Sequence, residues 1–140
     1  MFQTFIPKIK TTLQSVTEIQ EVKGYPTDKI GGYPCAIAIP TSFNNRYLTN
    51  ASNLKGFSFT IFLLVEMEQL GRQQAYEVVM PELVDSVLTA FDNDWGFASI
   101  LGSNRIWQVV DAGDWFVDNI DEGEVLVAEL TLTINMSNDI

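Results

Sequence analysis

Two long runs of alternating hydrophobic side chains constrain the fold more than any other feature of this sequence. Large apolar residues occupy every second position within residues 55–68, and residues 125–136 repeat the alternation. Because successive side chains of a β-strand point to opposite faces, both runs indicate long strands with one buried face. The side chains expected on the buried faces are Phe57, Phe59, Ile61, Leu63, Val65, Met67, Leu126, Ala128, Leu130, Leu132, Ile134 and Met136.

Two further segments have the spacing of amphipathic helices. Apolar side chains recur at intervals of three or four within residues 1–20 and again within residues 73–91. Proline is tolerated best in a first turn, so we expect the first helix to begin near Pro7, and Pro81 to kink the second helix or to start a new segment. The second face of residues 55–68 is polar at its ends and apolar in its middle, which predicts a helix over the centre of that face only.

Shorter elements are expected between these four. The polar, asparagine-rich residues 41–53 predict a long exposed loop, and the acidic residues 118–124 predict a turn. Strands are predicted at residues 16–23, ending at Gly24, at residues 35–39 between Pro34 and Pro40, at residues 105–111 and at residues 115–117. The fold class is therefore α+β: a single domain, residues 1–140, with one mixed or antiparallel sheet of about five strands packed with two main helices.

The tripeptide Gly-Tyr-Pro occurs twice, starting at Gly24 and Gly32, and Cys35 follows the second copy. This period is too short for a structural repeat, which needs roughly 20 residues or more. Proline at the two strand boundaries and glycine in the turn between them favour a corner. With no histidine and only Lys29 as a neighbouring cation in sequence, Cys35 is expected to be a buried, inert thiol.

Composition removes several classes of function. The chain has no histidine and one cysteine, which excludes an internal disulfide, the usual zinc and copper ligand sets, and Ser-His or Cys-His nucleophile pairs. We therefore expect no enzymatic activity, cofactor or metal. Acidic clusters could hold calcium or magnesium only through oxygen, and Ile120 falls where a calcium loop needs an oxygen ligand, which favours solvated turns. An acidic divalent-metal-binding domain of the cytoplasm remains the alternative from another class.

The charge balance bears on partners. The formal net charge is −10, from 18 acidic and 8 basic residues, and the basic residues are scattered singly. Such a surface repels phosphate, so specific binding to nucleic acid is not expected. No apolar run approaches the length of about 20 residues that a membrane span requires, so no membrane association is expected either.

The order of these elements resembles that of the tail terminator, or tail completion, proteins of long-tailed phages, the family of the lambda-type terminator. The resemblance rests on "GYPCAIA" at residues 32–38, a long loop containing Asn45 and Arg46, the strand at residues 57–67, a helix after a glycine and polar turn, and "VLVAELTLTI" at residues 125–134. It implies a structural virion protein, assembled in the host cytoplasm, at the head-proximal end of the tail.

The resemblance also implies how such a protein acts. A ring of identical subunits, a hexamer in the family, caps the tail tube, ends its polymerisation and offers a surface to neck and head-completion proteins, while DNA passes through an acidic lumen without specific binding. The alternative within the same class is a neck, head-completion or minor tail protein. Candidate contacts with subunits or partners are Arg46, Tyr47, Trp115 and Phe116; candidate lumen acids are Asp111, Asp114, Asp118, Asp121, Glu122 and Glu124.

Overall fold

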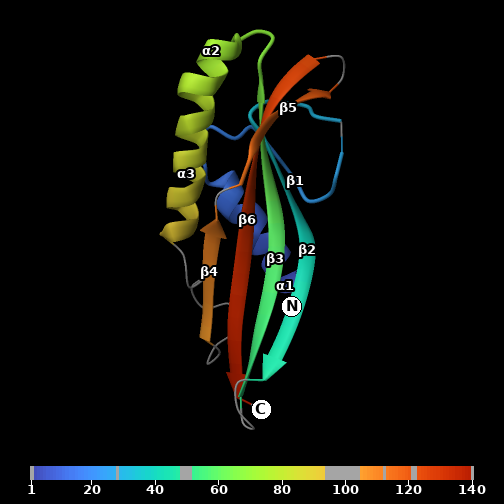
Figure 1. Cartoon of the computed structure of the whole chain (residues 1–140), viewed down its shortest axis with the longest axis vertical. Coiled ribbons are helices and arrows are strands. Elements are labelled where there is room, and N and C mark those ends of the chain that lie inside the picture. The colour runs from blue at the N-terminus through green and yellow to red at the C-terminus, as the bar shows by residue number, and fades with distance from the viewer. Residues whose placement is uncertain are drawn as a thin grey trace.

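A computed structural model of the chain describes residues 2–27, 29–47, 52–93, 105–111, 113–120 and 123–139. It contains one six-stranded sheet in the order β1-β2-β3-β6-β4, with β5 also paired to β6 (Figure 1). β1 is parallel to β2, and all other pairs are antiparallel. The elements are α1 (Phe2–Gln14), β1 (Glu21–Lys23), β2 (Cys35–Tyr47), β3 (Ser52–Glu66), α2 (Arg72–Gln74), the π-helical turn η1 (Ala75–Val79), α3 (Met80–Asp92), β4 (Arg105–Asp111), β5 (Trp115–Ile120) and β6 (Gly123–Asp139). The predicted α+β fold, a mixed sheet with two main helices, is confirmed.

The two long alternating runs form the paired central strands β3 and β6, as predicted. Every side chain expected on their buried faces is at most 3% exposed. Helices α1 and α3 pack against that face, and their apolar stripes join the same core; these helix side chains are Phe5, Ile9, Leu13, Met80, Leu83, Val87 and Phe91. Burying each large apolar side chain contributes about 1.5–3 kcal/mol. Most of the buried apolar side chains among the described residues belong to this core, so it supplies most of the hydrophobic stabilisation.

The opposite face of the sheet differs from the prediction. We expected a helix over its centre, but both main helices pack on the other side, and no described helix covers it (Figure 1). A second, smaller apolar cluster lies here. The partly buried side chains that pack against it include Ile30 and Tyr33 of the β1–β2 connection and Ile120 of β5. The face that carries Cys35, Ile37, Phe62, Leu64, Val125 and Val127 is called the open face below.

Strand β2 is longer than predicted because proline does not end it. β1 pairs only with residues 35–37 of β2, so beyond Ile37 the strand is an edge of the described sheet, where proline costs no ladder hydrogen bond. A bulge follows Pro40, and the hydroxyl of Thr41 donates to the carbonyl oxygen of Ser58 at 3.1 Å. The loop predicted at residues 41–53 is therefore wrong: β2 continues to Tyr47 and β3 begins at Ser52, while residues 48–51 lie outside the described part.

Pro7 acts differently from expectation, whereas the new helical segment predicted at Pro81 is confirmed, because α3 begins at Met80 and has Pro81 in its first turn. Helix α1 begins at Phe2 and contains Pro7, because the fully buried Phe5 anchors its first turns through an edge-on contact with Phe57 at 5.1 Å between ring centroids. The interruption predicted at Pro81 is a π turn, in which the N–H of Met80 bonds to the carbonyl of Ala75. The wider turn accommodates the ring of Pro81 without breaking the helical stretch.

Strand β5 corrects the acidic turn predicted at residues 118–124. It continues to Ile120, and β6 begins at Gly123, so Asp118 and Asn119 lie in a strand while residues 121 and 122 lie outside the described ranges. β5 pairs with the first part of β6 and β4 with a later part, both on the same edge. The predicted strand at residues 105–111 is confirmed with those bounds.

Candidate interaction surface

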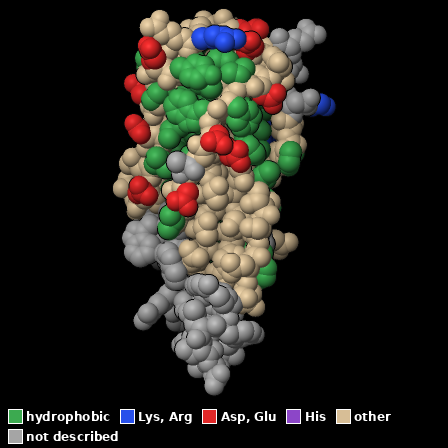
Figure 2. Space-filling model, viewed as in Figure 1, with side chains coloured by type: hydrophobic (Ala, Val, Ile, Leu, Met, Phe, Trp, Pro, Cys, Tyr) green, Lys and Arg blue, Asp and Glu red, His purple; other side chains and the backbone are tan. Residues whose placement is uncertain are grey.

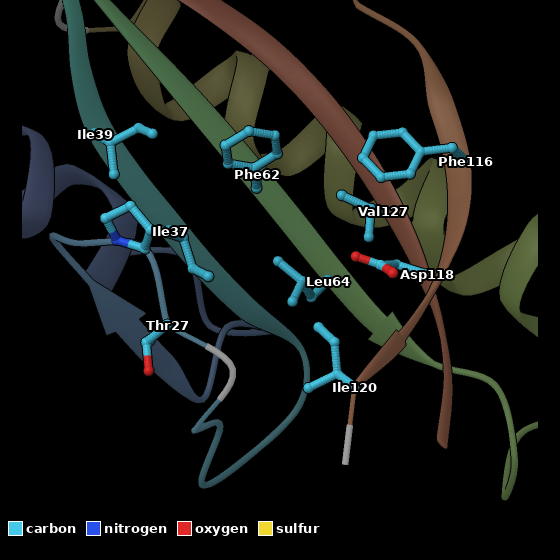
Figure 3. Close-up of a pocket in the computed structure, with 10 residues that line it drawn as sticks. Thr27, Ile37, Ile39, Phe62, Leu64, Phe116, Asp118, Ile120 and Val127 are labelled. Atoms are coloured by element: carbon cyan, nitrogen blue, oxygen red, sulfur yellow. The ribbon is translucent and has the colours of Figure 1, made fainter. Parts of the chain in front are cut away.

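A groove of about 180 Å³ crosses the open face (Figure 3). Its floor is apolar because every second side chain of a strand, and each pair of directly opposed residues on neighbouring strands, points to the same face. The register pairs Ile37 with Phe62 and Leu64 with Val127. Among the described residues that line it, Asp118 alone has a titratable side chain. The floor is Ile37, Ile39, Phe62, Leu64 and Val127, and the walls are Pro26 and Thr27 on one side and Phe116, Asp118 and Ile120 on the other.

The wall at Pro26 and Thr27 belongs to the corner predicted from the two Gly-Tyr-Pro copies. The first copy follows β1 and the second ends directly before β2, which confirms the corner. The carboxylate of Glu21 holds the turn: one oxygen accepts from the N–H groups of Gly31 (2.6 Å) and Gly32 (3.1 Å), and the other contacts Nζ of Lys23 at 2.6 Å. The hydrogen bond from Lys23, then those from the glycine N–H groups, lower the pKa of Glu21.

Cys35 lies beneath the groove, at the start of β2, and is fully buried. Burial raises the pKa of its thiol to about 11. The predicted buried thiol is confirmed. The strand predicted before the corner is shorter than expected: it covers only Glu21–Lys23, because Val16 and Ile19 join the core beneath the sheet from a turn after α1.

The opposite wall is β5, in which Trp115, Phe116 and Val117 are each 40% exposed. Phe116 pairs with Val127 and faces the groove, whereas Trp115 pairs with Ala128 and faces the side of the helices. Gly113 brings the chain close to β6, because a Cβ there would lie 1.9 Å from the carbonyl oxygen of Glu129. Trp115 and Phe116 were predicted to contact a partner together; they are exposed but point to opposite faces.

The candidate lumen acids are also divided between the two faces. Asp111 and Asp118 are on the open face, since they pair with Thr131 and Val125. Glu124 accepts two hydrogen bonds of 2.9 Å from the guanidinium of Arg72, at the start of the helical stretch. Asp114 lies just before β5, and Asp121 and Glu122 lie outside the described ranges. Within those ranges, no group of three or more acidic or cysteine side chains is placed to share a metal ion.

Arg46 and Tyr47 end strand β2, where their backbones pair with Leu54 and Asn53. Their predicted role as contact residues stays a prediction, because the structure describes only their backbones.

The floor of the groove was missed by the sequence argument. Its signal was present, because Phe62 and Leu64 make the second face of β3 apolar in its middle, but that pattern was assigned to a covering helix. Figure 2 shows the result: hydrophobic side chains gather over the upper part of this view with acidic side chains among and around them, and the described surface below them is mostly neither hydrophobic nor charged.

The sequence matches no protein-family model and no curated protein. Among the helices that the structure describes, none is long and apolar enough to cross a membrane.

Proposed function

We propose that this chain is a structural subunit that caps a phage tail tube as a ring, ends tail polymerisation and offers a surface to the neck and head-completion proteins. The observation that carries the proposal is the apolar groove on the open face. A hydrophobic patch rimmed by polar residues is typical of surfaces that bind another protein.

The lining of the groove supports a protein partner over a polar small molecule. Nine of the ten described residues that line it carry no charge at neutral pH, and Asp118 stands at a wall rather than on the floor. Aliphatic and aromatic side chains such as Ile39 and Phe62 offer contact area without the convergent polar groups that orient small ligands.

The charge of the chain supports the same function. Each copy has a formal charge of −10, and a ring multiplies that charge around its channel. An acidic wall lowers the local concentration of phosphate, so DNA would pass without adhering. Asp111 and Asp118 are exposed carboxylates that would contribute if the open face borders the channel.

The experiment is a tube-capping assay with the full chain. Tail-tube subunits of the phage that encodes this chain are polymerised, incubated with the purified chain, and then supplied with more tube subunits. Tube lengths are measured by electron microscopy. Capped tubes should stop growing. Tubes that grow equally with and without the chain would overturn the proposal, and binding to heads with unchanged tube growth would favour a neck protein instead.

A further inference from the structure

The floor of the groove has the composition of a covered surface. Its side chains Ile37, Phe62 and Val127 come from three adjacent strands, β2, β3 and β6 (Figure 3). Ile39 and Phe62 are partly exposed, and Phe116 at the wall is 40% exposed. The apolar face of a sheet normally packs against a second layer, yet no described helix lies over this one. A partner that covers the groove would bury these side chains.

The backbone of an occupant finds no hydrogen-bond partner on this floor. At Phe62 and Leu64, β3 pairs with β2 on one side and with β6 on the other, and at Val127 β6 pairs with β3 and β5. The N–H and C=O groups of the floor are therefore engaged within the sheet. An extended segment laid there would bury its own backbone groups without partners, whereas an α-helix pairs them internally. The floor therefore favours a helix.

The width of the floor agrees with a helix. Neighbouring strands lie about 4.8 Å apart, so β2 and β6 are separated by about 10 Å across β3. An α-helix with its side chains has a diameter of about 10–12 Å. The walls stand outside these strands, because β5 pairs with the far side of β6, and Pro26 and Thr27 follow β1 beyond β2. The cavity of about 180 Å³ can receive the apolar side chains of one helix face.

Carboxylates border the apolar floor. Asp118 stands at one wall. Glu66 and Glu129 are on the same face, because they follow the floor residues Leu64 and Val127 by two positions along β3 and β6. In Figure 2, acidic side chains lie among and around the hydrophobic patch. An occupant with cations beside its apolar stripe would complement these charges.

The cation that the register places on this face does not offset the carboxylates. Lys23 pairs with Ile37 in the sheet, and its Nζ contacts the carboxylate of Glu21 at 2.6 Å, so the two charges cancel. A second copy of this chain is a poor occupant, because each copy has a formal charge of −10. The charges of the open face therefore select a basic partner over another copy.

We propose that the groove on the open face binds an amphipathic α-helix of a partner protein, with the apolar stripe of the helix in the groove and its lysine or arginine side chains facing Asp118, Glu66 and Glu129. Such long side chains lay their methylene groups on the apolar rim and place their charges beside the carboxylates. This inference rests on the proposed function, because it takes the groove as the surface offered to a partner, and it specifies the chemistry of that partner.

The test measures the binding of two synthetic peptides to the full chain by fluorescence anisotropy. Both peptides are helical and about 18 residues long, with leucines spaced three and four apart along one face. Lysines flank the leucine stripe in one peptide, and glutamates flank it in the other. The lysine peptide should bind, with an affinity that falls as salt screens the opposite charges, and the glutamate peptide should not.

Substitutions with matched controls locate the binding site. Asp118→Lys should weaken binding of the lysine peptide about 2- to 10-fold and strengthen that of the glutamate peptide. Glu82→Lys makes the same charge change on an exposed position of α3, which packs on the other face, and should alter neither. Phe62→Ala should weaken the lysine peptide about tenfold. Phe43→Ala removes an exposed ring that lies against Phe57 on the helix side and should have no effect. Circular dichroism verifies the fold of each variant.

Several results would overturn the proposed partner. They are equal affinity for both peptides, no binding of the lysine peptide, or binding that neither Asp118→Lys nor Phe62→Ala weakens. Equal binding of a lysine peptide interrupted by proline would assign the groove to an extended segment instead. Self-association of the wild-type chain that Phe62→Ala abolishes would assign it to a second copy.

The outcomes also separate this inference from the proposed function. A chain that caps tubes but does not bind the lysine peptide would refute the basic helix and leave tube capping standing. A chain that binds the lysine peptide in the groove but caps no tube would refute tube capping and leave the chemistry of the groove standing.

Discussion

Phe59 and Phe62 lie three residues apart on β3 and face opposite sides of the sheet, so replacing each with alanine tests which side is covered. Phe59 is 1% exposed beneath the helices, and truncating it leaves a cavity that costs about 3–5 kcal/mol of unfolding free energy. Phe62 lies on the floor of the groove, where water can fill the space that the ring vacates. Only part of its transfer free energy is lost, about 1 kcal/mol.

The assay is thermal unfolding in dilute solution, followed by far-ultraviolet circular dichroism. For a chain of 140 residues, a loss of 1 kcal/mol lowers Tm by about 3 °C. Phe59→Ala should therefore lower Tm by about 10–17 °C, and Phe62→Ala by about 3 °C. Equal losses in the two variants would refute the reasoning, because they would mean that the open face is covered in the free chain as fully as the core is.

Two further predictions concern buried and strained positions. Cys35 has its pKa raised from 9.0 to about 11, so the unfolded thiol ionises first and the free energy of unfolding should fall as pH rises from 9 to 11. Cys35→Ala has no thiol to titrate, so the difference in unfolding free energy between it and the wild type, measured by urea titration, should change between pH 9 and pH 11. A difference that does not vary with pH would contradict the raised pKa of Cys35. Gly71 has φ of +84° and ψ of 155°, a region occupied almost only by glycine, with nothing within 4 Å of an added Cβ, so Gly71→Ala should cost about 1–3 kcal/mol through the backbone alone. An unchanged urea midpoint would show that the chain adopts this conformation without strain.

Local patterns predicted the long strands and both helices because each pattern repeats over a dozen residues or more. Apolar side chains alternate along β3 from Phe57 to Val65, and the buried face follows directly from that alternation. The ends of elements were predicted less well. Pro40 was expected to end a strand, but β2 continues because its outer edge is not paired at that point among the described strands.

The candidate surface was predicted only in part. Trp115 and Phe116 were selected because two aromatic residues stand in an acidic segment, and both are exposed. Their opposite directions depend on the pairing of β5 with β6, which local sequence does not encode. The floor of the groove combines Ile37, Phe62 and Val127 from three strands distant in sequence, so no single segment contains it.

By itself, the sequence determined the α+β composition, the buried face of β3 and β6, the corner around the two Gly-Tyr-Pro copies and the excess of acid. Each of these depends on consecutive residues or on composition. The tertiary structure alone decided that α1 and α3 cover the same face, that β4 and β5 share one edge of β6, and that side chains of β2, β3 and β6 meet in the floor of the groove. The physical reason is that strand pairing and helix docking are set by contacts between distant segments, whose side chains compete for the same buried area.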